Sequence, residues 1–199
     1  MFTTIIFDWG GVCTYGHLLK DFSASLSKKI NLTKEQIEQK LREDEQLYEL
    51  GKIDPKKFWK GFVSKIDNKI NAKEAQKLFH SSYKTNENML NFILSLRKKY
   101  KTILLTNNYS DLFEKMKEVY DLNKYFDKVY SSSELNTKKP KPDIYQYVLK
   151  DLKVKANECI FVDDKEDNVL GAEKIGIKAI LFKEFNQFKK ELLTPYKIS

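Results

Sequence analysis

Acidic, hydroxyl and basic side chains stand at the ends of short apolar runs in this 199-residue sequence. Asp8 ends the first run, and Thr106 ends the second. A lysine-rich loop, residues 136–145, follows the third run, and Asp163 and Asp164 end the fourth. Together these residues offer a carboxylate nucleophile, a hydrogen-bond donor, a cation and a pair of carboxylates, provided that the fold brings the run ends together.

Three carboxylates at one place predict a bound cation. Asp8, Asp163 and Asp164 repel one another, and without a cation among them they are driven to take up protons. Oxygen ligands of this kind favour Mg²⁺ over zinc or copper. Mg²⁺ beside a lysine and a hydroxyl suits a phosphate group, because the cations neutralise the phosphate oxygens while a carboxylate attacks phosphorus. The residue types therefore predict phosphoryl transfer from a small phosphorylated substrate.

The apolar runs are typical of strands in a parallel sheet. They are rich in β-branched and aromatic residues and cover residues 3–8, 101–107, 128–132, 158–164 and 178–182. Amphipathic helical segments separate the last four runs, and this alternation predicts an α/β fold with helices on both faces of the sheet. The carboxyl ends of parallel strands meet at one edge, which is where ligands bind in such sheets.

A long helical insert interrupts the alternation. Between about Thr14 and Thr85 no strand is expected, and Gly51, Asp54 and Pro55 mark a turn into a new helix. The insert is far longer than an ordinary connection between a strand and a helix, so we expect it to form a second unit. Because it leaves the chain directly after the first strand, it should lie near the carboxyl ends of the strands.

The composition and the net charge of the chain limit the classes of partner that it can bind. With 41% hydrophobic and 32% charged residues, the chain can bury one core and a small second unit. No apolar stretch approaches the ~20 residues of a membrane helix, and no signal peptide is evident, so we expect a cytoplasmic protein without a membrane partner. The net charge of +8 comes from lysines dispersed among acids, which predicts no nucleic-acid partner. Cys13 and Cys159 are expected to be reduced.

Four segments in this order resemble the haloacid dehalogenase-like hydrolase superfamily, and the resemblance spans essentially the whole chain. The segments are FDWGGV, LLTNN, KKPKPDIY and FVDDKEDN. A further segment, LYELGKIDPKKFW, resembles the four-helix cap of the phosphatase-rich branch. The resemblance implies a Rossmann-like core of residues 1–14 and 86–199, with an inserted helical cap of residues 15–85.

The resemblance also implies roles for the motif residues. It makes Asp8 the nucleophile, Thr106, Asn107 and Lys139 the phosphate and substrate binders, and Asp8, Gly10, Asp163 and Asp164 the groups that hold or support Mg²⁺. In the family the nucleophile becomes an aspartyl-phosphate. Lys139 is preferred to its neighbouring lysines because it directly precedes Pro140, as in the family pattern.

Gly10 departs from that pattern. Most phosphatases of the superfamily carry Asp there, which protonates the leaving group while its backbone carbonyl binds Mg²⁺. Gly10 keeps the carbonyl and loses the acid, whose proton transfer is worth typically ~100- to 10,000-fold in rate. His17, where core and cap join, is a candidate replacement, since imidazole exchanges protons readily near neutral pH. His80 is expected on a helix surface, and Trp9 under the cap.

Three interpretations of this departure remain open. In the favoured one the protein is a phosphatase whose leaving groups need little protonation, such as those of anomeric sugar phosphates, and a branch resembling sugar-1-phosphatases has Asn or Gly at this position. In the second the protein is similar to phosphonoacetaldehyde hydrolase, which uses a cap lysine. In the third it is a catalytically weak binding or regulatory protein. Monomer and homodimer are both open.

Overall fold

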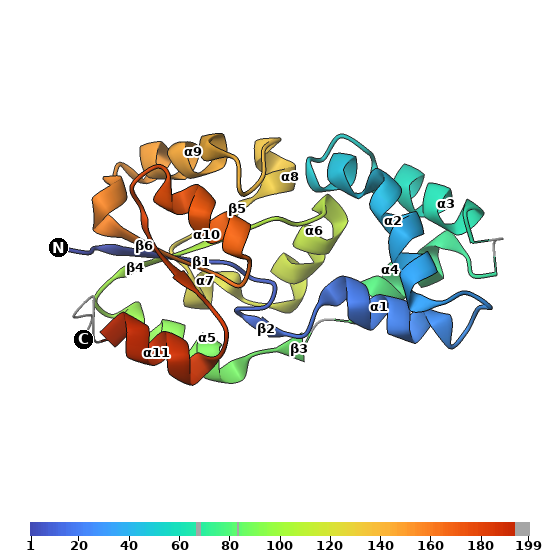
Figure 1. Ribbon diagram of the computed structural model, residues 1–199, viewed down its shortest axis with the longest axis horizontal. Helices are drawn as coiled ribbons and strands as arrows, with labels where there is room; N and C mark the ends of the chain where they lie inside the picture. Colours follow the sequence, from blue (N-terminus) through green and yellow to red (C-terminus); the bar gives the residue numbers. More distant parts are fainter. Residues whose placement is uncertain (67–68, 83, 194–199) are drawn as a thin grey trace.

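A five-stranded parallel sheet forms the centre of the protein (Figure 1). The structure is a computed structural model that describes residues 1–66, 69–82 and 84–193. The sheet order is β5–β4–β1–β6–β7, with bounds Thr4–Phe7 (β1), Lys101–Thr106 (β4), Lys128–Ser131 (β5), Cys159–Asp163 (β6) and Lys178–Leu181 (β7). Every neighbouring pair is parallel. The predicted α/β fold is confirmed, and each strand lies within one residue of its expected bounds.

Helices cover both faces of the sheet. They are α5 (Glu87–Leu96), α6 (Ser110–Val119), α7 (Leu122–Tyr125), α8 (Ser132–Leu135), α9 (Pro142–Leu152), α10 (Glu166–Glu173) and α11 (Phe185–Leu193), with a short 3-10 turn at Ala156–Glu158. Ile5 and Phe7 pack toward α5, α6 and α11, whereas Ile6 packs toward α9 and α10 (Figure 1). Alternate residues of β1 thus enter two cores, and the whole strand is buried. Trp9 lies beside Tyr120 in the first core, so its expected place under the cap was wrong.

Four further helices form a separate bundle beyond the carboxyl ends of the strands (Figure 1). They are α1 (Leu18–Ser27), α2 (Lys34–Glu49), α3 (Pro55–Ser64) and α4 (Ala72–His80). Thr33, Asp54 and Asn71 begin three of these helices, and each side chain accepts a hydrogen bond from the first turn of its helix. The bundle buries its own apolar cluster, which includes Phe22 and Trp59. We call this bundle the cap and the sheet with its helices the core.

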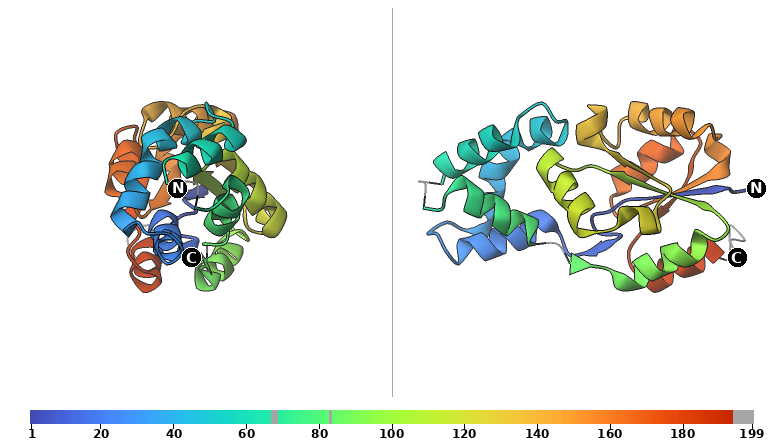
Figure 2. Two further views of the ribbon diagram at one scale, coloured as in Figure 1. Left: turned by 90° about the vertical axis from the view of Figure 1, so that its right-hand side faces the viewer. Right: turned by 180° about the vertical axis from the view of Figure 1, so that it is seen from behind.

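Two short strands form the junction of core and cap. Thr14–Tyr15 (β2) and Lys84–Thr85 (β3) pair antiparallel where the chain leaves and re-enters the core (Figure 2). The expectation of no strand between residues 14 and 85 was therefore wrong at the two ends of the insert. Two residues are too few to create an alternating pattern, and the pairing arises because the two connecting segments run side by side.

Asp111, on α6, joins the core to the cap through a buried carboxylate. Its Oδ2 accepts hydrogen bonds from Trp59 Nε1 at 2.9 Å and Gln76 Nε2 at 2.6 Å, and it lies 3.1 Å from His80 Nε2. Burial by itself raises the pKa of Asp111, but these bonds, led by that to His80, lower it to about 2. His80 is therefore an interior residue at this joint, with its side chain only 16% exposed, and its expected place on a helix surface was wrong.

Two smaller expectations concern the cysteines and the membrane. Cys13 and Cys159 are both buried and free, as the sequence predicts. Burial raises the pKa of both thiols, which keeps them protonated. None of the described helices is long and apolar enough to cross a membrane.

Replacing Asp111 with Asn should destabilise the protein in a pH-dependent way. The carboxyl has a pKa of about 2 in the folded protein and an ordinary value of 3.8. A depressed pKa stabilises the fold above pH 3.8 and ceases to do so as the pH falls toward 2, so Asp111→Asn should cost about 2 kcal/mol at pH 7 and about half of that at pH 3. Urea denaturation at both pH values measures this. The exposed Asp121→Asn serves as control, and equal losses in the two variants would contradict the expectation.

Candidate active site

The ammonium group of Lys139 lies at the centre of the polar groups at the strand ends. Its Nζ is 2.8 Å from Asp8 Oδ1 and 2.7 Å from Asp163 Oδ2, and it donates to the Leu105 carbonyl at 2.8 Å. The side chain is fully buried. Burial opposes the positive charge, but the carboxylates of Asp163 and Asp8 outweigh it and raise the pKa of Lys139. Lys139 therefore stays protonated between two carboxylates.

Asp163 is the most firmly held of the carboxylates. Its Oδ2 binds Lys139, while its Oδ1 accepts hydrogen bonds from the backbone nitrogen of Lys165 and from Asn168 Nδ2, both at 2.9 Å. Asn168 lies on α10, whose first turn follows β6 directly. The bond between Asn168 and Asp163 was not predicted from the sequence, although a spacing of five residues across a strand-to-helix turn is compatible with it. Asp163 thus orients Lys139 and has little freedom of its own.

The carboxylates of Asp8, Asp163 and Asp164 fit a metal site. One oxygen from each lies within 4.8 Å of the others. Asp164 Oδ1 is buried and has no hydrogen-bond partner among the described residues. Burial raises the pKa of Asp164 and also that of Asp8, to about 7, and for Asp8 the attraction of Lys139 only partly offsets burial and its carboxylate neighbours. A bound cation would supply the missing partner and remove the repulsion.

The two glycines after Trp9 have different structural roles. Gly11 has a φ of +76°, and a Cβ there would lie 2.3 Å from Asp164 Oδ2, so a side chain at this position would collide with the carboxylate. At Gly10 an added Cβ would meet no described atom within 4 Å. The fold therefore requires glycine at 11 but leaves room for a side chain at 10. Packing does not explain why this chain lacks an acid at Gly10.

The end of β4 places Thr106 and Asn107 near Lys139. Thr106 is the last residue of the strand and is almost fully buried. The Asn107 amide donates from Nδ2 to the Lys139 carbonyl and accepts at Oδ1 from the Lys139 nitrogen, both at 2.9 Å. Asn107 thereby fixes the loop that carries Lys139, at the cis peptide bond to Pro140. This positioning contact was not anticipated from the sequence.

A cavity of about 220 Å³ opens at these strand ends. Asp8, Gly10, Asn107 and Asp164 line it from the core, and its cap-side lining includes His17, Lys20, Arg42, Glu45 and Glu49. Thr106, Lys139 and Asp163 are buried next to the cavity instead of lining it. Its volume is below the ~300–1,000 Å³ of pockets for drug-sized ligands, which indicates a small ligand.

Two of the cap residues at the cavity were missed in the sequence. Glu45 accepts a hydrogen bond from Tyr109 Oη at 2.7 Å, and Glu49 Oε2 lies 2.5 Å from Lys138 Nζ. Both glutamates belong to α2, whose many charged residues are typical of a solvated helix face. Their spacing of four residues places them on one side of the helix, but nothing in the sequence pattern predicts that this side faces the cavity.

Residues 2–176 match the family profile described as haloacid dehalogenase-like hydrolase. This protein belongs to the haloacid dehalogenase-like hydrolases. The resemblance inferred from the four sequence segments is thereby confirmed. The matched range begins before β1 and ends after α10, so it includes the cap as well as most of the core.

Relatives of this hydrolase span nearly its whole length. The chain is 28% identical to D-ribitol-5-phosphate phosphatase of Bacteroides thetaiotaomicron, with 96% of this chain and 97% of that protein covered. It is 26% identical to a sesquiterpene phosphatase of Aspergillus oryzae, with 88% and 87% covered. A crystal structure of a family enzyme from B. thetaiotaomicron in complex with magnesium superposes with a TM-score of 0.82 at 23% identity, covering 95% and 98%. The structural likeness supports the same fold.

Adding Mg²⁺ should raise the melting temperature of the wild-type protein, because a ligand that binds only the folded state stabilises it. At a Mg²⁺ concentration of 100 times Kd, the free energy of unfolding rises by roughly 2.7 kcal/mol. Asp164→Asn should lose most of this shift, while its metal-free melting temperature should not fall, because one repelling charge is gone. Differential scanning fluorimetry measures both quantities. Asp167→Asn, an exposed change on α10, should keep the full shift, and an undiminished shift in Asp164→Asn would exclude Asp164 as a ligand.

Proposed function

We propose that this hydrolase is a Mg²⁺-dependent phosphatase that acts on a small phosphorylated metabolite, such as a sugar phosphate, through an aspartyl-phosphate on Asp8. The observation that carries the proposal is the buried Lys139 between Asp8 and Asp163, beside an unpartnered Asp164 oxygen at the edge of a small cavity. Relatives named as phosphatases support it, as does a magnesium complex among the similar structures.

Asp8 is the proposed nucleophile. Lys139 binds its Oδ1, which favours the ionised carboxylate and fixes its orientation. Attack of an Asp8 oxygen on phosphorus forms a new P–O bond and breaks the bond to the leaving oxygen, which departs with its electron pair. Water then attacks phosphorus, the bond from phosphorus to the Asp8 oxygen breaks, and inorganic phosphate leaves with the protons of the water, which restores the Asp8 carboxylate. Thr106 and Lys139 are the proposed donors to the phosphate oxygens.

The groups proposed to hold Mg²⁺ are Asp8, Asp164 and the carbonyl of Gly10. Asp163 supports them through Lys139 and does not need to bind the ion itself. When bound, Mg²⁺ supplies positive charge against the phosphate oxygens. The protein alone brings three carboxylates and one ammonium group to this place, so the phosphate requires that additional charge.

The absence of an acid at Gly10 constrains the substrate. A leaving oxygen that departs without a proton must itself be a weak base, as in anomeric sugar phosphates, acyl phosphates or aryl phosphates. His17 lines the same cavity and is the alternative source of a proton. Its side chain belongs to the residue before α1, at the junction of core and cap, where a small movement of the cap changes its distance from the leaving group.

Hydrolysis of p-nitrophenyl phosphate should depend on Mg²⁺ and fall by roughly 1,000-fold or more in Asp8→Asn. An anomeric sugar phosphate should turn over far faster than a simple alkyl phosphate, because only the alkoxide leaving group needs a proton. The release of inorganic phosphate measures the rate of hydrolysis of each of the three substrates. Equal rates on the anomeric and alkyl esters would point to a replacement acid, which His17→Ala then tests. No turnover of any substrate would favour the binding or phosphonoacetaldehyde hydrolase-like alternatives.

Restoring an acid at Gly10 should create activity on alkyl phosphates. A Cβ added at Gly10 meets no described atom within 4 Å, so Gly10→Asp should raise kcat on an alkyl phosphate by about 100-fold, with a much smaller effect on p-nitrophenyl phosphate. Gly10→Asn has the same shape without the proton and is the matched control. If the Asp and Asn variants act alike on the alkyl ester, the missing acid does not limit this enzyme.

A further inference from the structure

We propose that Glu45 and Glu49 of the cap select a leaving group that is neutral and rich in hydroxyls, as in a sugar or sugar alcohol, and discriminate against one with a second anionic group. The inference rests on the proposed phosphatase function and concerns the far side of the same cavity. Carboxylates accept hydrogen bonds from hydroxyls and repel other anions. Glu45 and Glu49 are thus assigned as specificity-determining residues.

The first argument is their place in the cap. Glu45 and Glu49 lie four residues apart on one side of α2, and both line the cavity that contains Asp8. Their side chains are 20% and 16% exposed, whereas Glu43 of the same helix is 52% exposed and pairs with Lys65. The helix therefore turns two of its glutamates toward the cavity and another toward solvent.

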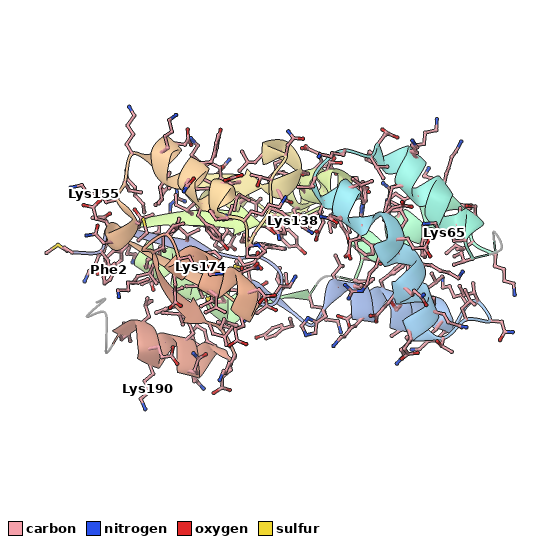
Figure 3. All side chains as sticks on the ribbon, turned by 45° about the horizontal axis from the view of Figure 1, so that its top comes forward. Phe2, Lys65, Lys138, Lys155, Lys174 and Lys190 are labelled. Atoms are coloured by element: carbon pink, nitrogen blue, oxygen red, sulfur yellow. The ribbon has the colours of Figure 1, made fainter. Side chains whose placement is uncertain are left out.

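The second argument is that the core fixes both carboxylates in place. Tyr109 donates to Glu45 Oε1, and Lys138 binds Glu49 Oε2. Figure 3 shows Lys138 where the core meets the cap. A carboxylate has about four acceptor positions, so each glutamate keeps positions for the hydroxyls of a ligand. Because the two groups are held before a ligand arrives, binding costs them little conformational entropy.

The third argument is the distribution of charge along the cavity. The positive groups proposed for the phosphate, Lys139 and the metal, lie at the core end. On the α2 side of the cap end the ammonium of Lys138 is already paired with Glu49, and Arg42 lies 3.6 Å from Glu45 and is 60% exposed. Lys20, the cap lysine that lines the cavity, belongs to α1. Next to α2 a second anion on the ligand would have to break these pairs or lie against the carboxylates of Glu45 and Glu49, whereas a hydroxyl can donate to them.

The contacts of Glu45 and Glu49 with Tyr109 and Lys138 also tie the cap to the core. If these contacts only hold the cap against the core, neutralising either glutamate should alter the binding of all phosphorylated ligands by the same factor. Selection of the leaving group predicts instead that the preference between ligands changes. A ratio of affinities for two matched ligands therefore separates the two roles.

The experiment measures ligand binding to Asp8→Asn protein with Mg²⁺ by isothermal titration calorimetry. The matched ligands are α-D-glucose 1-phosphate with α-D-glucuronate 1-phosphate, and D-ribose 5-phosphate with 5-phospho-D-ribonate. In each pair one member carries an additional carboxylate. The neutral member of at least one pair should bind about tenfold or more tightly, and adding Glu45→Gln or Glu49→Gln should reduce that preference by roughly tenfold. Glu43→Gln should leave the preference unchanged.

Equal or tighter binding of the carboxylated member in both pairs would overturn the inference. So would Gln variants that weaken both members of a pair by the same factor, because that result assigns the glutamates only a structural tie. Phosphate release by the wild-type protein tests the proposed function separately. If the protein binds ligands selectively but hydrolyses none, the proposed phosphatase function is wrong and the inference about Glu45 and Glu49 stands. If it hydrolyses substrates but does not bind them selectively, the phosphatase function stands and the inference is wrong.

Discussion

The buried ammonium group of Lys139 is the interaction on which the site depends. It lies between Asp8 and Asp163, and its positive charge offsets part of the rise that burial causes in the pKa of Asp8. Removing one member of such a pair leaves an unpaired buried charge, which costs roughly 3–5 kcal/mol. The protein therefore surrounds this ion pair with fixed groups. The Leu105 carbonyl accepts from the ammonium, and the amide of Asn107 holds the backbone of Lys139.

The cap turns this charged edge of the sheet into a small enclosed site. Tyr109 and Leu112 of the core enter the apolar cluster of the cap, and Asp111, in the first turn of α6, accepts hydrogen bonds from α3 and α4. The start of α6 is therefore shared by both parts of the molecule. Since α6 follows directly from the segment that carries Asn107, the cap is anchored close to the core side of the cavity.

Gly10 and Gly11 are adjacent, but only Gly11 is required by the local backbone structure. Gly11 is imposed by a positive φ and by the nearness of Asp164, whatever the chemistry of the site. Gly10 has a conformation and surroundings that impose no such requirement, because an added Cβ would meet no described atom within 4 Å. The pattern of the superfamily drew attention to position 10. Only the coordinates show that a Cβ at this position would meet no described atom within 4 Å, so crowding at the Cβ does not account for the glycine.

The sequence by itself determined the fold class, the five strands, the inserted helices and the placing of Asp8, Thr106 and Asp163 at strand ends, because these features follow from local periodicity and the geometry of parallel sheets. It did not determine the roles of Asn107, Asn168, Glu45 and Glu49, nor the interior place of His80. Each of those depends on a partner distant in the chain or across a turn, such as Tyr109 for Glu45 and Asp111 for His80. The sequence pattern of a charged helix is the same whether its charged face lies against water or against a cavity. Only the tertiary structure decides which, because burial and hydrogen-bond partners arise when separate elements pack together.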